Sequence, residues 1–180
     1  LTPEDETDWA HWITREHAAE RVGVPGFLAC RIFRALGTAA NRYFILYELE
    51  DENVVGSAAY VARLNAPTPW SQRIMPKLGN FMRGGGVMIA RAGRGEGATI
   101  MALRVEKLPE IPAELARALV ACDGIAAVQI GATDEARTSV PTAEKGMRKD
   151  EGFFSGLLLI EALDAASLQA TPEQLKAPTS

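Results

Sequence analysis

The sequence predicts an α+β protein made of two successive units, each built from a few strands and helices. Hydrophobic residues form 47 % of the 180-residue chain, which is enough to bury a core. Apolar positions recur in some segments at every second residue, as in a strand, and in others at three- and four-residue spacing, as in a helix. A glycine-rich joint at 91–97 separates two runs of such segments. These observations predict a first unit over 1–92, a second over 97–170 and a tail over 171–180.

The chain is expected to begin with a helix that runs to about Val22. Thr2 has the character of an N-cap, Pro3 suits the first helical position, and acidic residues follow in the first turn. Gly23 and Pro25 then end the helix.

Turn residues and strand formers divide the rest of the first unit. The expected elements are a strand over 26–36, a hairpin connection over 37–41, a strand over 42–50, a short helix over 54–64, an extended stretch over 65–70, a helical turn over 71–78 broken at Pro76, and a strand over 81–92 interrupted by glycines at 84–86.

The second unit is expected to repeat the pattern loosely. Its predicted elements are a strand over 98–105, a helix over 109–122, a strand over 124–132, a polar irregular stretch over 133–151 with a helical turn at 142–145, a strand over 153–162 and a short helix over 164–169.

The order of these elements suggests two ferredoxin-like units. The first half has the order helix, strand, strand, helix, strand, so one more strand in front of residue 1 would complete the βαββαβ pattern. Either that strand precedes residue 1 in a longer chain, or the second half supplies it. The two halves would then be diverged copies of one unit.

Charge and composition exclude several classes of function. The net charge of −4 and the pI of about 5.3 argue against a nucleic-acid partner. No apolar run approaches the roughly 18 residues of a membrane span, and the acidic, polar start has no character of a secretory leader. Cys30 and Cys122 lie in apolar surroundings, so we expect buried free thiols and a cytoplasmic protein. With two cysteines and two histidines, we expect neither a metal nor another cofactor.

One stripe of the first helix changes from apolar to polar along its length. Its members are Trp9, Trp12, Ile13, Glu16, His17 and Glu20. A stripe that ends in an imidazole between two carboxylates is typical of a helix over a small polar pocket. His17 would then be a general acid–base, and Glu16 or Glu20 would either orient it or raise its pKa. The alternative is a histidine that interacts favourably with the end of the helix, beside solvated carboxylates.

Further candidates come from the strands and loops that follow. Arg31 alternates with apolar residues at 27, 29 and 33, so it needs an anionic partner, which would be a substrate carboxylate, Glu16 or Glu48. Substrate-binding candidates with aromatic rings are Tyr43 and Tyr47 on one strand face, Tyr60 as a pocket wall, and Trp70, which two prolines would hold as a lid. Arg73 and Arg83 are weaker anion-binding candidates, for which a solvated position is the default.

Together these residues resemble the dimeric α/β-barrel superfamily, and most closely its EthD-like and uncharacterised bacterial members. The resemblance rests on Trp12, Glu16-His17 and Val24-Pro25-Gly26-Phe27, followed by Arg31, Tyr43, Tyr47-Glu48, Tyr60 and the 65–70 segment. Over 97–163 it rests on element order and on the Glu144…Arg148 segment. It implies ferredoxin-like units whose sheets close into a barrel, a pocket between each sheet and its helices, a homodimer, and an inward-pointing histidine at position 17.

Residues and resemblance together predict an enzyme. We expect a cofactor-free isomerase, lyase or hydrolase of a small aromatic-derived or unsaturated carboxylate, of the kind used in the catabolism of aromatic compounds. His17 would transfer the proton, and Arg31 would hold an anionic or enolate oxygen. The alternative is a non-catalytic module of the same fold that binds a ligand or takes part in an assembly.

Overall fold

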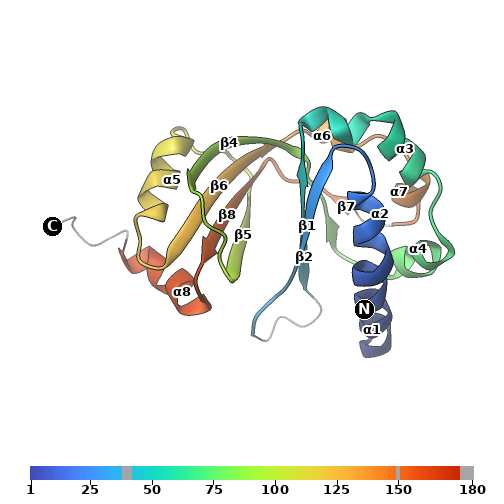
Figure 1. The fold of residues 1–180 in the computed structure, drawn as a ribbon, viewed down its shortest axis with the longest axis horizontal. Coiled ribbons are helices and arrows are strands. Elements are labelled where there is room, and N and C mark those ends of the chain that lie inside the picture. The colour runs from blue at the N-terminus through green and yellow to red at the C-terminus, as the bar shows by residue number, and fades with distance from the viewer. Residues whose placement is uncertain (38–41, 149–150, 175–180) are drawn as a thin grey trace. The chain divides into compact units, whose positions relative to one another are not determined.

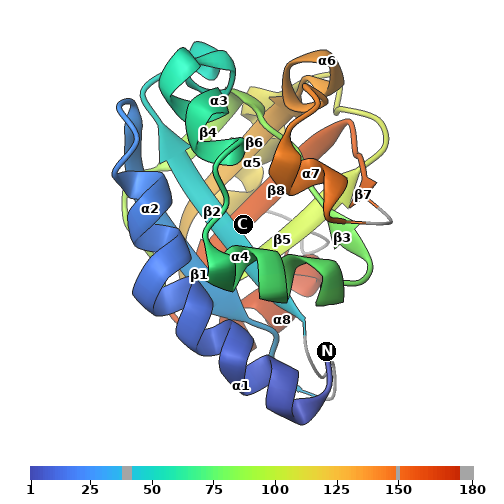
Figure 2. The same ribbon diagram turned by 90° about the vertical axis from the view of Figure 1, so that its right-hand side faces the viewer.

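The computed structural model describes residues 1–37, 42–148 and 151–174, and it has the mixed α+β composition that the sequence predicts (Figures 1 and 2). The chain divides into two compact units. Unit 1 contains residues 1–85 and 135–153, and unit 2 contains residues 86–134 and the chain from 154 onward. The division therefore differs from the predicted break at 92–97, because the 135–153 stretch belongs with the first unit.

Unit 1 begins with the expected helix, which has three parts. They are α1 (Pro3–Trp12), a π-helical segment η1 (Ile13–His17) and α2 (Ala18–Val22). The Thr2 hydroxyl accepts a hydrogen bond from the Asp5 amide at 3.1 Å, which confirms the predicted N-cap. The π-helical segment was not predicted. Such segments are rare and often occur at functional sites.

Two antiparallel strands, β1 (Phe27–Arg34) and β2 (Tyr43–Leu49), form a hairpin. The predicted connection over 37–41 lies mostly outside the described residues. A core of Trp9, Trp12 and Ile13 from the helix packs on one face of this hairpin, against Ile32, Tyr43 and Ile45.

The rest of unit 1 consists of short elements. They are η2 (Glu52–Gly56), α3 (Ala58–Leu64), α4 (Pro69–Ile74), η3 (Met75–Lys77), β3 (Phe81–Met82), α6 (Glu135–Thr138), α7 (Ala143–Gly146) and β7 (Glu151–Gly152). Strand β3 pairs in parallel with β7, so the returning segment adds a strand to this unit. The predicted strand over 81–92 is therefore two strands, β3 in unit 1 and β4 in unit 2.

Unit 2 is a four-stranded antiparallel sheet with two helices. Its strands are β4 (Gly86–Gly93), β5 (Thr99–Val105), β6 (Ile125–Thr133) and β8 (Gly156–Ala162), in the order β4-β6-β8-β5. The core contains residues from the sheet together with Ala116 and Leu119 of α5 (Pro112–Val120) and Leu168 of α8 (Ala165–Gln174).

The strands that the structure describes form open sheets of two, two and four members, and no closed barrel occurs among them. In the same part of the chain, no helix is both long and apolar enough to cross a bilayer.

Candidate functional site

His17, the predicted acid–base, ends the π-helical segment and lies inside unit 1. Its side chain is 9 % exposed, and its ring packs on Trp12 with 4.2 Å between centroids. No described residue forms a hydrogen bond with its Nδ1. Burial lowers the pKa of His17 well below its ordinary value, and the nearby Arg21, Arg148 and Arg63 lower it further. The imidazole is therefore neutral near pH 7, and the same surroundings disfavour its protonated form.

The two carboxylates beside His17 in the sequence have other partners. Glu16 accepts a hydrogen bond from the Thr68 hydroxyl at 2.6 Å, and Glu20 lies 3.3 Å from Arg63 in an ion pair. The prediction that one of them raises the pKa of His17 is wrong. The charged groups that act on the imidazole are arginines, which shift its pKa in the opposite direction.

A buried ion pair stands next to His17. Arg21 of α2 donates hydrogen bonds to both carboxylate oxygens of Glu144 on α7, and each side chain is 3 % exposed. Two charges this deeply buried are tolerated only when they are paired. The pair therefore fixes α7 against the first helix, although 123 positions separate the two residues.

Arg31 lies on the other face of the hairpin from the first helix. It is opposite Leu46 in the strand register, whereas its neighbour Ile32 packs against the helix. Its guanidinium lies over the Phe33 ring at 5.0 Å. The predicted grouping with Phe27 fails, because a β-bulge between Phe27 and Ala29 puts the Phe27 ring in a cluster with Tyr47 and Tyr60. The structure therefore does not bring Arg31 together with His17.

The predicted substrate-binding aromatics take part in packing. The Tyr43 ring lies 3.9 Å from Trp9, and its hydroxyl donates to Glu6. The Tyr47 and Tyr60 rings pack on the Phe27 ring, with 5.7 and 5.0 Å between the ring centroids. Burial raises the pKa of Tyr47, whose hydroxyl faces the Cys30 thiol.

Trp70 belongs to α4 and not to a loop. Pro69 begins that helix, and the Thr68 hydroxyl caps it by accepting from the Ser71 amide at 3.0 Å. The Trp70 indole donates to Asp8 at 2.9 Å, which attaches it to α1. The expectation of a proline-stiffened lid is thus wrong in its local structure, since a proline at the first helical position begins a helix.

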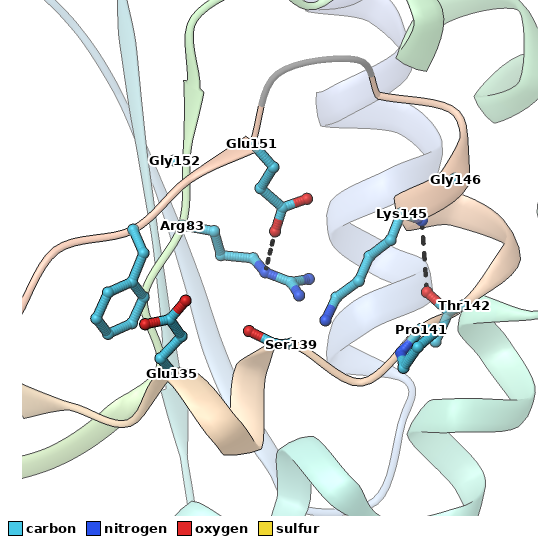
Figure 3. Close-up of a pocket in the computed structure, with 10 residues that line it drawn as sticks. Arg83, Glu135, Ser139, Pro141, Thr142, Lys145, Gly146, Glu151 and Gly152 are labelled. Carbon is cyan, nitrogen blue, oxygen red and sulfur yellow. Dashed lines mark hydrogen bonds and ion pairs between the residues drawn. The ribbon is translucent and has the colours of Figure 1, made fainter.

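A cavity of about 380 Å³ opens in unit 1 between α6, α7 and the β3–β7 pair (Figure 3). It is lined by Arg83, Glu135, Ser139, Pro141, Thr142, Lys145, Gly146, Glu151, Gly152 and Phe153. Figure 3 shows the Lys145 amine directed toward the Arg83 guanidinium. None of the seven residues predicted for the site lines this cavity.

One carboxylate that lines the cavity, that of Glu151, forms ion pairs with two arginines. Glu151 Oε1 lies 3.1 Å from Arg83 Nε, and its Oε2 lies 3.0 Å from Arg148 Nη2. The Arg148 guanidinium also covers the Phe81 ring at 4.4 Å. Burial lowers the pKa of Arg83, which Glu151 partly offsets. The cavity is thus lined by charges of both signs: Arg83 and Lys145 are cationic, and Glu135 and Glu151 are carboxylates.

Among the residues that line the cavity, Lys145 has a pKa that suits proton transfer near neutral pH. Burial, together with the charges of Arg83 and Arg148, lowers its pKa to about 8, against the opposing effect of Glu151. Near neutral pH its amine is present in both protonation states, which suits a general acid–base or a nucleophile. Helix α7 therefore joins two environments, because Glu144 faces the buried ion pair and Lys145 faces the cavity.

The sequence did not single out Lys145. It suggested Arg83 only as a weaker anion-binding candidate, which was expected to lie in solvent. The one local signal was the helical turn at 142–145, which the structure confirms: the Thr142 hydroxyl accepts from the Lys145 amide at 3.4 Å. Cys30 and Cys122 are free thiols, as predicted, but only Cys122 is buried, whereas Cys30 is partly exposed. In the part of the chain that the structure describes, no three His, Cys, Asp or Glu side chains gather as a metal site would need.

Comparison with protein-family models, with curated proteins and with solved structures finds no match for this chain. The cavity of unit 1 and the charged interior beside it are therefore the observations from which a function must be argued.

Proposed function

We propose that this chain is an enzyme that binds a small anionic molecule in the cavity of unit 1 and transfers a proton on it. The observation that supports this most directly is the presence of Arg83 and Lys145 in one cavity, with the pKa of each lowered and that of Lys145 near neutrality. The volume lies within the range of roughly 300–1,000 Å³ that small-molecule sites occupy.

The charge of the cavity favours a carboxylate ligand. Glu151 pairs with Arg83 Nε and Glu135 also lines the cavity, so a ligand carboxylate would bind the Lys145 amine and the Arg83 guanidinium through atoms other than that Nε. The planar guanidinium of Arg83 suits the two oxygens of a carboxylate. In this proposal Arg83 takes the anion-holding role that the sequence suggested for Arg31.

Lys145 would act as the acid–base group on the bound carboxylate. An amine with a pKa of about 8 can both accept and return a proton near neutral pH. Isomerisation, elimination and hydrolysis of an unsaturated or aromatic-derived carboxylate all need such a transfer. His17, the acid–base that the sequence suggested, does not line this cavity, and its surroundings disfavour the protonated imidazole, so the proton transfer is assigned to Lys145.

The resemblance to dimeric α/β barrels is part of the proposal. Unit 2 supports it, since β5 and β6 are parallel strands joined through α5, and β8 lies between them, as in the split βαβ arrangement of ferredoxin-like units. We propose that a barrel, if one forms, requires a second copy of the chain. Light scattering on the purified protein tests for that homodimer.

Titration of the protein with fumarate, sorbate and pyruvate in a calorimeter tests the proposed function. Binding should weaken about 10–100-fold in Arg83→Gln, the loss expected from one charge-assisted hydrogen bond. Arg15→Gln, an exposed arginine on the first helix, is the matched control. Proton transfer is followed by NMR as deuterium uptake into the ligand in D₂O. Tight binding without uptake or conversion would favour the ligand-binding module, and no binding of any anion would refute the proposal.

A further inference from the structure

We propose that Lys145 is a nucleophile whose amine condenses with the carbonyl carbon of a small 2-oxo acid, while Arg83 holds the acid's carboxylate. This inference rests on the proposed function, because it uses the same cavity and the same anion-binding side chain. It goes beyond that function in naming a covalent step and the substrate class that the step requires.

The position of Lys145 suits a nucleophile. Its backbone belongs to α7, where the Thr142 hydroxyl caps the turn and the adjacent Glu144 is fixed by the buried Arg21. The residue is therefore anchored on one side while its amine extends into the cavity (Figure 3). A nucleophile held on an anchored element attacks from a defined direction, which lowers the entropic part of the barrier.

The surroundings of the amine also suit a nucleophile. Desolvation and a neighbouring cation are the two conditions that make a lysine reactive in proteins, and the cavity supplies both. With a pKa of about 8, about one tenth of the amine is unprotonated at pH 7, whereas an ordinary lysine offers less than about one part in a thousand. The free-base fraction is thus raised by about two orders of magnitude.

The covalent step balances without any further reagent. The nitrogen lone pair of Lys145 attacks the carbonyl carbon, and the carbonyl oxygen takes up a proton to give a carbinolamine. That oxygen then leaves as water with a second proton, and nitrogen and carbon form an imine. The sum is one amine plus one carbonyl giving one imine plus one water. The Ser139 hydroxyl, which belongs to a residue that lines the same cavity, would donate a hydrogen bond to the departing oxygen.

Arg83 and Lys145 set the substrate class, with Arg83 binding through atoms other than its Nε, which pairs with Glu151; Glu135 is the second carboxylate in the lining. A 2-oxo acid carries its carboxylate next to the carbonyl carbon, so one end can face the Arg83 guanidinium while the carbon faces the Lys145 amine. A simple ketone has the carbonyl but not the anion, and it should react much less. The inference therefore predicts selectivity for the acid over the ketone.

Reductive trapping with pyruvate and sodium borohydride tests the inference on the intact protein. Borohydride delivers hydride to the imine carbon and leaves a stable secondary amine. Mass spectrometry should find one adduct per chain, heavier than the protein by one pyruvate less one oxygen atom, and peptide mapping should place it on Lys145. Acetone should give at least ten times less adduct. The trapping rate should rise with pH with a midpoint near 8.

Variants separate this inference from the proposed function. Lys145→Arg should lose the adduct and keep pyruvate binding in the calorimeter, Arg83→Gln should reduce both at least tenfold, and Lys107→Arg, which changes an exposed lysine, should alter neither. Bound pyruvate without an adduct, or adducts spread over several lysines, would overturn the inference and leave the proposed function in place. If no anion binds, both fail. If Lys145→Arg does not fold, the mapped position and the pH midpoint in the unaltered protein decide the question.

Discussion

Arg21 and Glu144 form an ion pair in the interior of unit 1, with each side chain 3 % exposed. Both oxygens of the carboxylate accept from the same guanidinium nitrogen. The pair connects the end of the first helix with the short helix that carries Lys145. The position of the amine in the cavity therefore depends on a contact that lies outside the cavity.

Removing one partner of this pair should destabilise unit 1. Glu144→Ala leaves Arg21 buried without its carboxylate, a change that typically costs about 3–5 kcal/mol. Urea unfolding followed by tryptophan fluorescence measures it, because the three tryptophans of the chain, Trp9, Trp12 and Trp70, all lie in unit 1. The exposed Glu50 gives the control Glu50→Ala, which should change stability by less than about 0.5 kcal/mol. Equal effects of both substitutions would contradict the assigned role of the pair.

His17 should make the stability of unit 1 depend on pH. Its pKa in the folded protein lies below its value in the unfolded chain, so below about pH 6.5 only the unfolded chain takes up a proton. Stability is then lost as the pH falls from about 6.5 toward 5, by up to about 1.4 kcal/mol for each pH unit. His17→Phe, which keeps a ring against Trp12, should remove this part of the dependence. Melting temperatures of both proteins at several pH values test it, with His11→Gln at an exposed histidine as control.

Arg83 should control the protonation of Lys145. Arg83→Gln removes a cation that lowers the pKa of this amine, so the pKa should rise above 8, although burial continues to hold it below its ordinary value. Glu151 acts in the opposite direction, and Glu151→Gln should lower the pKa. Competitive labelling with acetic anhydride, read by mass spectrometry at Lys145 over a range of pH, measures both shifts. Shifts of the same sign in the two variants would show that charge is not the cause.

Gly26 should be intolerant of a side chain. Its φ is 89°, in the region that glycine adopts most easily, and an added Cβ would lie 2.5 Å from a methyl carbon of Val54. Gly26→Ala should therefore destabilise unit 1 by about 2 kcal/mol or more, since backbone strain and the steric clash add. In the double variant with Val54→Ala the clash is relieved and the strain stays, so stability should recover only in part. Full recovery would mean that the backbone tolerates alanine.

Features determined by local chemistry could be predicted from the sequence. The first helix follows from the Thr2 cap and Pro3, and both long strands of unit 1 follow from their alternation. The π-helical segment within the helix could not be predicted, because its residues have ordinary helical spacing. Nor could the bulge after Phe27, where one extra residue reverses which face the following side chains occupy.

The site was harder to predict because it depends on pairing between distant segments. Arg83 and Lys145 line the same cavity, beside the parallel pair β3–β7. The sequence instead predicted one long strand over 81–92 and an irregular stretch over 133–151. His17 was found from a helical stripe, but it is buried against Trp12 and does not line the cavity of unit 1. Its expected carboxylate partners instead bind Thr68 and Arg63, which lie in segments whose packing no periodicity encodes.

The return of residues 135–153 to unit 1 has a consequence for the order in which the protein is made. When the ribosome has released the first 85 residues, Arg21 is present but Glu144 has not been synthesised, and β3 has no β7 to pair with. The sheet of unit 2 can be completed only later, because its inner strand β8 is the last of its strands to be translated. Neither unit can reach its native contacts during most of translation. A premature stop near residue 130 would remove Glu144, β7 and β8, so it should abolish both units at once and would not release a folded first half.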